Sequence, residues 1–376
     1  MKVLLILEAS GGGTGRHIID LASDLIKSGC SVILVYSGLR ALPDFYHEIN
    51  LVAGLTVLRV DMRRPPHPSD VIALFKLRTI IKNYGPFDVI HGHSSKGGAL
   101  ARLASIGMPG IRVYTPHAFR TIDPSLNVIL YKLYSFIERL LSRISNGIIL
   151  VSEGEKRHAL QIGLPENKLY VIENGMDKQE FGSTRATLRN RLHISQDDLC
   201  IGFVGRLVPQ KAPDCLIRAF ALIAHKYPNV RLIMLGDGPL QSDLHTLSDQ
   251  LDIRSQITWL ENENGAEFMS VFDIFVMPSL YEAFPYVLLE AANAGLPIIA
   301  TPVGGTDEML IDRVNGFLVD HNKPVKIAEA LESLINNPKL RSKMGEASQN
   351  IGQKYSVSAM TGKTLTLYRD LLNLAN

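Results

Sequence analysis

Short apolar runs alternate with stretches of helical periodicity along almost the whole chain. In the first half, the apolar runs cover residues 3–7, 32–36, 57–60, 89–91, 113–115, 148–151 and 169–172. Helical patterns lie between them, for example at residues 15–27, 69–83 and 126–142. Apolar strands that alternate with helices are typical of a parallel sheet covered by helices on both faces. The first half therefore predicts a doubly wound α/β domain.

The second half repeats this pattern. Its apolar runs cover residues 199–204, 231–235, 257–259, 274–276, 298–301 and 316–319, each beside a helix-competent stretch. A chain of 376 residues also exceeds the size at which single cores stop growing, about 250–300 residues. We expect two α/β domains in tandem. The boundary is predicted near the turn dipeptide Asn174-Gly175, which a polar segment at residues 178–198 follows.

Composition and charge exclude several classes of protein. A net charge of +2 is too small to indicate a nucleic-acid partner. The three cysteines, Cys30, Cys200 and Cys215, are scattered and have no metal-ligand spacing, which favours a reducing cytoplasm. No apolar run approaches the ~20 residues of a membrane span. The first apolar run is interpreted as a buried strand because Glu8 and a glycine cluster follow it. The sequence thus predicts a soluble, cytoplasmic protein.

A glycine cluster, residues 10–15, follows the first strand and opens a helix. Glycines allow the backbone to approach an anion, and a helix N-terminus offers unpaired N–H groups. A flexible turn without a ligand is the alternative. A dinucleotide fingerprint fits badly because its third glycine would fall on Arg16, and a Walker loop ending at Thr364 would need a glycine at Val357.

Two cations follow the first strand of the second half. Arg206 comes directly after Gly205, and Lys211 lies five residues further on, before a helix. An arginine can bind two oxygens at once and a lysine acts as a point charge, so the pair suits a diphosphate. The alternative is two solvated surface cations.

Two acids, Glu282 and Glu290, follow the strand at residues 274–276. Pro285 fits the first turn of a helix, so we expect Glu282 on a loop and Glu290 within the helix. A glycosidase pair is disfavoured because eight helical residues span ~12 Å, whereas glycosidase carboxyl groups lie roughly 5–10 Å apart. Two separate roles are favoured, one acid at ribose hydroxyls and the other at a sugar. For Glu290, a surface helix acid is the alternative.

The sequence predicts no metal site. It contains no Asp-x-Asp motif to hold a divalent ion on a diphosphate, so cations and helix N-termini would neutralise that group. His91 and His93 have no third ligand at a suitable spacing, which makes zinc improbable. His117 follows the fifth strand, where it could bond a hydroxyl or phosphate, or serve a structural role.

The order of these features resembles glycosyltransferase family 4. The resemblance spans nearly the whole chain and rests on the glycine cluster, His117, Asn174-Gly175-Met176-Asp177, Gly205-Arg206 with Lys211, Gly236-Asp237-Gly238-Pro239, and Glu282 with Glu290. Residues 94–98 and 115–119 are similar to bacterial members that build exopolysaccharide, O-antigen or other lipid-linked glycans. The resemblance implies the GT-B fold, with two Rossmann-like domains facing across a cleft and the last helix, about residues 356–372, returning to the first domain. It assigns residues 1–175 with 356–376 to acceptor binding and residues 176–355 to the nucleotide-sugar donor.

The resemblance also implies the reaction. This is the retaining transfer of a hexose or N-acetylhexosamine, without metal or cofactor, from a nucleotide sugar to a glycan or polyprenyl-diphosphate-linked acceptor in polysaccharide biosynthesis. UDP-glucose and UDP-N-acetylglucosamine are the favoured donors. The alternatives are a sugar-nucleotide epimerase of the same fold and a non-catalytic nucleotide-sugar-binding protein.

The resemblance carries roles to particular residues. Gly12 and Gly13 would lie against the donor phosphate, Gly205, Arg206 and Lys211 would bind the diphosphate, and Glu290 would hold the ribose. Glu282, with the backbone of Ala283, Phe284 and Tyr286, would meet the sugar and phosphate, and His117 would lie near the sugar's C6 hydroxyl. The catalytic set is His117, Arg206, Lys211 and Glu282. Pro285 stands where the family usually has glycine, so one backbone donor is missing and sugar specificity stays open.

Two segments suggest where a lipid-linked acceptor could be met. Residues 126–142 and their flank carry Lys132, Arg139 and Arg143 among apolar side chains. A second basic run comprises Arg59, Arg63, Arg64, Lys76, Arg78 and Lys82. Either segment could contact an anionic membrane at its inner face. A packed helix with a solvated face is the alternative.

Overall fold

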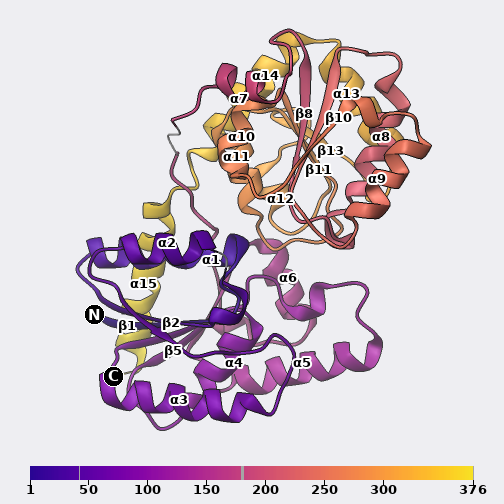
Figure 1. The fold of residues 1–376 in the computed structure, drawn as a ribbon. Coiled ribbons are helices and arrows are strands. Elements are labelled where there is room, and N and C mark those ends of the chain that lie inside the picture. Colours follow the sequence, from indigo (N-terminus) through magenta and orange to yellow (C-terminus); the bar gives the residue numbers. More distant parts are fainter. Residues whose placement is uncertain (42, 179–181, 376) are drawn as a thin grey trace. The chain divides into compact units, whose positions relative to one another are not determined.

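The computed structural model describes residues 1–41, 43–178 and 182–375, which form two compact units. Unit 1 comprises Met1–Gly175 and Ser356–Asn376, and unit 2 comprises Met176–Tyr355. Each unit is built on its own parallel sheet with helices on both faces (Figure 1). The fold class expected from the alternating pattern is confirmed.

Unit 1 contains a sheet in the order β3-β2-β1-β4-β5-β6-β7. Its strands are β1 (Lys2–Leu7), β2 (Ser31–Tyr36), β3 (Thr56–Arg59), β4 (Val89–His93), β5 (Ile111–Thr115), β6 (Gly147–Leu150) and β7 (Leu169–Val171). All neighbouring pairs run parallel. These are the strands that the apolar runs predict, with ends that differ by up to two residues: β4 extends to His93 and β5 begins at Ile111.

Helices cover both faces of this sheet. They are α1 (Gly12–Lys27), α2 (Pro43–Leu51), α3 (Ser69–Tyr84), α4 (Ser95–Ala104), α5 (Val128–Ser142), α6 (Glu153–Gln161) and α15 (Val357–Ala375). One apolar cluster joins the sheet to α1 and α15, and another joins its opposite face to α3 and α4. Because each strand meets a cluster on either side, its residues are apolar almost without interruption.

The last helix returns to unit 1, as expected. α15 packs against α1, and its Met360 and Leu371 belong to the same apolar cluster as β1 and β2. Its Tyr368 hydroxyl lies 2.6 Å from His91 Nδ1 on β4. Among the described residues, no helix is both long and apolar enough to cross a lipid bilayer.

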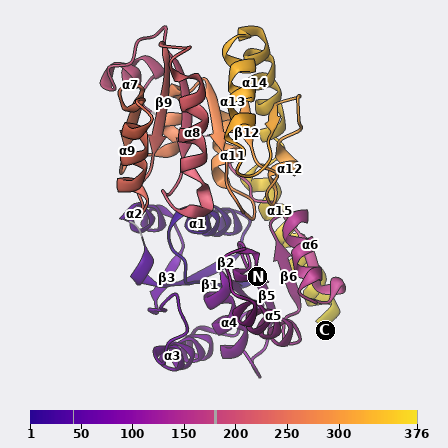
Figure 2. The same ribbon diagram turned by 90° about the vertical axis from the view of Figure 1, so that its right-hand side faces the viewer.

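Unit 2 contains a sheet in the order β10-β9-β8-β11-β12-β13. Its strands are β8 (Leu199–Val204), β9 (Val230–Leu235), β10 (Ile257–Leu260), β11 (Ile274–Met277), β12 (Ile298–Ala300) and β13 (Gly316–Leu318). Its helices are α7 (Arg185–Arg191), α8 (Pro213–Ala224), α9 (Gln241–Gln250), α10 (Gly265–Phe268), α11 (Tyr286–Asn293), α12 (Thr306–Met309), α13 (Pro324–Ile335) and α14 (Pro338–Gly352). Figure 2 shows these helices flanking the strands from a second direction.

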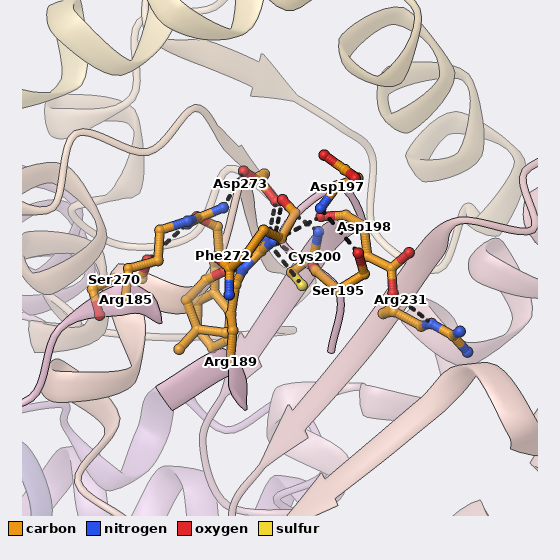
Figure 3. Close-up of polar contacts among 12 residues, drawn as sticks. Arg185, Arg189, Ser195, Asp197, Asp198, Cys200, Arg231, Ser270, Phe272 and Asp273 are labelled. Carbon is orange, nitrogen blue, oxygen red and sulfur yellow. Dashed lines mark hydrogen bonds and ion pairs between the residues drawn. The ribbon is translucent and has the colours of Figure 1, made fainter. Parts of the chain in front are cut away.

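An ion-pair network around the buried Arg189 joins α7 to the amino ends of β8 and β11 (Figure 3). Asp273, directly before β11, accepts from Arg185 Nη2 at 2.6 Å, Arg189 Nη2 at 2.9 Å and the Cys200 backbone N–H at 2.8 Å. The Arg189 side chain is fully buried. Its Nη1 donates to the carbonyl oxygens of Ser195, Gln196 and Asp198. The network lies at the amino ends of the strands, so it stabilises the fold from the edge opposite to the predicted ligand-binding residues.

Replacing Asp273 with alanine should lower the free energy of unfolding by about 3–5 kcal/mol, because Arg189 would keep a buried charge without its acid. The matched control is Asp249→Ala, which removes the exposed partner of Arg254 and should cost at most about 1 kcal/mol. Urea unfolding followed by circular dichroism measures both. Equal costs for the two variants would contradict the structural role of Asp273.

Candidate functional site

The strand order reverses once in each sheet, between β1 and β4 in unit 1 and between β8 and β11 in unit 2. At such a reversal the loops after the two central strands leave on opposite faces and open a crevice. Ligands of open α/β sheets bind there, at the carboxyl ends of the strands. The side chains that follow β1, β4, β8 and β11 are therefore the first candidates in each unit.

In unit 2, the residues that follow β8 and β11 meet. Gly205 and Arg206 come directly after β8, and Arg206 is exposed. Lys211 ends the short 3₁₀ helix Pro209–Lys211, and Glu282 lies on the loop after β11. Lys211 Nζ donates to Glu282 Oε1 at 2.5 Å, although 71 residues separate them in the chain. Their side chains are only 16% and 9% exposed, so the pair is largely shielded from water.

Backbone bonds hold the two loops of this pair together. The Leu280 N–H donates to the Gln210 carbonyl oxygen at 2.7 Å, and Gln210 Nε2 donates to the Tyr281 carbonyl oxygen at 3.0 Å. Gly304, after β12, packs against the same loop: a Cβ atom there would lie 2.5 Å from the Glu282 carbonyl oxygen. The position of Glu282 therefore depends on three segments of unit 2.

The Gly236-Asp237-Gly238 turn after β9 supports the Gly205-Arg206 loop. A Cβ atom at Gly236 would lie 2.1 Å from the Gly205 carbonyl oxygen, so only glycine allows this approach. The Leu207 N–H also donates to the Asp237 carbonyl oxygen at 2.7 Å. These residues are part of the resemblance to the family, and the structure shows that the turn holds the backbone beside Arg206.

The segment after Glu282 leads into α11. Ala283, Phe284, Pro285 and Tyr286 are buried, and α11 begins at Tyr286 with Pro285 as its N-cap. Pro285 thus precedes the helix, whereas the sequence placed it in the first turn. Its ring fixes φ near the value needed to enter a helix, which explains why it occupies this position. Glu282 lies on the loop and Glu290 within α11, as predicted, and Glu290 is half-buried.

In unit 1, three histidines gather at the carboxyl ends of the central strands. His93 ends β4, His117 follows β5, and His17 lies in α1, which follows β1. His93 Nδ1 lies 3.1 Å from His117 Nε2, and the rings of His17 and His117 are 4.5 Å apart, edge to face. His17 Nδ1 also forms a 3.0 Å hydrogen bond with Asn174 Oδ1. His17, His93 and His117 are called the histidine cluster below.

Burial keeps these imidazoles neutral. Desolvation lowers the pKa of His17 from 6.5 to about 4, against a smaller opposing effect of the bond to Asn174. Desolvation, then the nearby histidines, holds the pKa values of His93 and His117 well below the usual range. His91, which bonds Tyr368 and Thr115, has a lowered pKa for the same first reason. Neutral rings can act as hydrogen-bond donors, acceptors or metal ligands.

The histidine cluster could hold a transition metal. One nitrogen from each ring lies within 4.8 Å of the others, and three neutral imidazoles are a known ligand set for zinc. From the sequence, His93 has no third ligand at a suitable spacing. The structure corrects this reasoning, because the partners of His93 are His17 and His117, which come from different elements. A test based on sequence spacing cannot detect them.

Glu155 holds the backbone beside His117, a role that the sequence analysis missed. Its Oε1 accepts from the Ala118 N–H at 2.7 Å and its Oε2 from the Val151 N–H at 2.9 Å. His117 and Ala118 adopt φ values of 52° and 80°, which non-glycine residues rarely do, so these bonds stabilise an unfavourable turn. Ser152 and Glu155 have capping-box spacing, a signal that could have identified Glu155.

The glycine cluster leaves the start of α1 open. α1 begins at Gly12, three residues before the predicted start, and its N-cap Gly11 makes no side-chain cap bond. Gly12 and Gly13 are exposed. The first N–H groups of this helix thus remain available for an acceptor such as a phosphate oxygen.

Two Rossmann-like units in one chain are the architecture of the GT-B glycosyltransferases, and comparisons with known proteins identify the class. The family model described as Glycosyltransferase Family 4 matches residues 11–180, and the model described as Glycosyl transferases group 1 matches residues 184–351. The chain belongs to glycosyltransferase family 4 and is a transferase enzyme.

Similar proteins come from several lineages. A glycosyltransferase of Methanocaldococcus jannaschii is 30% identical, covering 95% of this chain and 94% of its own. The UDP-Gal:alpha-D-GlcNAc-diphosphoundecaprenol alpha-1,3-galactosyltransferase of Escherichia coli is 26% identical, covering 81% of this chain and 80% of its own. The crystal structure of HepE from Anabaena, in complex with UDP and glucose, has a TM-score of 0.85 at 21% identity and covers 98% of this chain and 100% of its own. Its likeness shows the same fold.

Unfolding should become easier as the pH falls below 6.5. Histidines with depressed pKa values bind fewer protons when folded than when unfolded, so acid favours the unfolded chain by up to about 1.4 kcal/mol per pH unit and histidine. Glu155 acts oppositely between pH 4.5 and about 7, because burial raises its pKa to about 7. Four histidines with lowered pKa values outweigh one such acid, so the urea midpoint should fall between pH 7 and pH 5.

The variant His17→Gln should make this pH slope shallower, because it removes one of the buried imidazoles. Replacing the exposed His321 with glutamine is the matched control and should leave the slope unchanged. Urea midpoints at several pH values measure both. An identical slope in His17→Gln and the unaltered protein would contradict the buried neutral state of His17.

Proposed function

We propose that this protein is a retaining, metal-independent glycosyltransferase of polysaccharide biosynthesis. It transfers a hexose or N-acetylhexosamine from a UDP-sugar, with UDP-glucose and UDP-N-acetylglucosamine favoured, to a glycan or polyprenyl-diphosphate-linked acceptor. The observation that carries this proposal is the contact between Lys211 and Glu282 where the strand order of unit 2 reverses, with Arg206 on the same loop as Lys211.

The three side chains complement the charged part of a nucleotide sugar. Arg206 is exposed and can bind two oxygens of a diphosphate, while Lys211 has three N–H groups, of which Glu282 engages one. A bound diphosphate can therefore share Lys211 without displacing Glu282. Glu282 has a second oxygen that can accept from a sugar hydroxyl. In this proposal the cations stabilise the leaving diphosphate, and a divalent ion is unnecessary.

The remaining predicted residues extend this assignment. Glu290, one helical turn inside α11, would accept from ribose hydroxyls, and the open N-terminus of α1 at Gly12 and Gly13 would meet a phosphate. His117 would contact the sugar, because Glu155 holds its loop and desolvation keeps its ring neutral. These roles come from the resemblance to the family, and the geometry of each unit is compatible with them.

The known relatives support the choice of donor and acceptor. HepE has been solved with UDP-glucose as well as with UDP and glucose. The E. coli relative is named for the transfer of galactose from UDP-galactose to a diphosphoundecaprenol-linked sugar, and another relative, CapM of Staphylococcus aureus, for capsular polysaccharide biosynthesis. These names favour UDP over GDP and a lipid-linked acceptor.

Retention follows if the acceptor attacks from the face that the leaving group vacates. The bond between sugar C1 and the diphosphate oxygen breaks through an oxocarbenium-like state, and the acceptor oxygen bonds C1 on the same face. The acceptor's proton passes to the departing phosphate, so UDP carries it away. The protein would contribute leaving-group electrostatics and positioning, with no general base required.

A donor panel tests the proposal. Thermal-shift measurements with UDP- and GDP-sugars should show a higher melting temperature with a UDP-sugar, since a ligand of the native state stabilises it.

Transfer to a polyprenyl-diphosphate-linked sugar should then proceed equally with and without EDTA, and NMR should show the donor's anomeric configuration in the product. Epimerised UDP-sugar without acceptor would favour the epimerase, and binding without transfer would favour a binding protein. Loss of activity with EDTA would show that a metal is needed and would refute metal independence.

Removing one cation from the predicted donor site should slow transfer by ~10²–10³, the usual effect of losing one donor to a developing charge. Arg206→Ala is the cleaner variant because Arg206 is exposed, whereas Lys211→Ala leaves Glu282 buried without its partner. The matched control is Lys226→Ala, an exposed lysine of unit 2 that pairs with Glu332. Near-normal turnover in Arg206→Ala with an unchanged melting temperature would overturn the assignment of Arg206.

A further inference from the structure

Helix α5 buries polar side chains and exposes apolar ones, which is the reverse of an ordinary surface helix. Its buried residues include Ser135, Glu138 and Ser142. Along its outer side run Ile129, Leu133, Phe136 and Leu140, which are 79%, 48%, 57% and 50% exposed. A surface helix normally buries its apolar stripe and solvates its polar face. These four residues are called the outer stripe below.

A buried ion pair fixes this orientation. Glu138 Oε2 accepts from Arg102 Nη2 of α4 at 3.1 Å, and Glu138 Oε1 accepts from the Tyr114 hydroxyl of β5 at 3.1 Å. The Arg102 side chain is fully buried, and its guanidinium lies 3.9 Å from the centre of the Tyr114 ring. Rotating α5 to bury its outer stripe would leave Arg102 without an acid inside the protein, which is strongly unfavourable. The exposed stripe is therefore built into unit 1.

Cations flank the outer stripe. Lys132, Arg139 and Arg143 are exposed, and each follows a stripe residue by three positions, which places it beside that residue on the helix surface. Glu138 is the one acid of α5, and it points inward to Arg102. The outward surface is thus apolar and positively charged. This combination matches the interface of an anionic lipid surface, where apolar side chains enter the acyl boundary and cations meet the headgroups.

We propose that the outer stripe of α5 docks unit 1 onto an anionic lipid surface. α5 lies with α3 and α4 on one side of the sheet of unit 1 (Figure 1). Tyr131 of α5 packs on the apolar cluster that contains Phe119, two residues after His117, so docking would hold the His117 loop near the lipid-bound helix. The reason to dock, which is access to a lipid-linked acceptor, rests on the proposed function.

The structure favours α5 over the second basic run that the sequence suggested. In that run, Arg59 is bound to Asp61, and Arg78 donates to the Ala104 and Ile106 carbonyl oxygens at the end of α4. These two cations of the run already serve contacts within unit 1. A second copy of the chain is a poorer occupant of the outer stripe than lipid, because a two-fold pairing of this face would oppose Lys132, Arg139 and Arg143 with identical charges.

Vesicle flotation of the full chain tests the proposal. The protein should float with vesicles of phosphatidylcholine and phosphatidylglycerol, and far less with phosphatidylcholine alone. Ile129→Glu with Phe136→Glu should weaken binding at least about tenfold, because it puts charge into the acyl boundary. Lys132→Glu with Arg143→Glu should weaken it by about fivefold or more per cation, and the loss should shrink in high salt. The matched control is Leu222→Glu, a 59% exposed leucine on α8 of unit 2, which should bind normally.

The outcomes separate this proposal from its rivals. Equal binding by the α5 variants and Leu222→Glu, or no binding of the unaltered protein, would overturn it. A dimer in light scattering that Phe136→Glu dissolves would show that a second copy occupies the stripe instead. The thermal shift with UDP reads out the donor site separately. Vesicle binding without a UDP shift would support the docking surface and refute the proposed function. A UDP shift without vesicle binding would support the proposed function and refute the docking surface.

Discussion

Parallel strand pairing, with a single reversal of strand order in each sheet, is the constraint on which the rest of this structure depends. All strands of a unit point the same way, so their carboxyl ends share one edge, and the reversal opens a crevice at β1/β4 and at β8/β11. Lys211 and Glu282 meet at one of these crevices and the histidine cluster forms at the other. Reactive side chains from distant parts of the chain become neighbours without any local sequence signal.

Ion pairs of a buried arginine, Arg189 in unit 2 and Arg102 in unit 1, set orientation at the other edges and faces. Asp273 ties Arg185 and Arg189 to the amino ends of β8 and β11, away from the carboxyl-end loops (Figure 3). In unit 1, the Arg102–Glu138 pair holds α5 with its outer stripe exposed. A buried ion pair adds little net stability, but breaking it is costly, so it selects one arrangement of the elements around it.

Periodicity predicted the elements well, because burial on both faces forces strands to be apolar. The loop position of Glu282, the helical position of Glu290 and the return of α15 were also predicted correctly. The ends of elements were predicted less accurately, since α1 begins three residues before its predicted start, at Gly12, and β4 ends two residues after its predicted end, at His93. Sequence analysis missed the partners of His93, the hydrogen bond between Glu155 and Ala118, and the exposed apolar face of α5. Each of these features depends on residues from separate elements.

By itself, the sequence determined the α/β architecture, the order of the family's motifs and the placement of chemically useful residues at strand ends. These properties are local, because they depend on the spacing of apolar residues and on turn and cap chemistry. Only the tertiary structure decided which of those residues touch: Lys211 with Glu282, His93 with His117, and Glu138 with Arg102. Such contacts depend on strand order and helix packing, for which the spacing of residues along the chain carries no direct information.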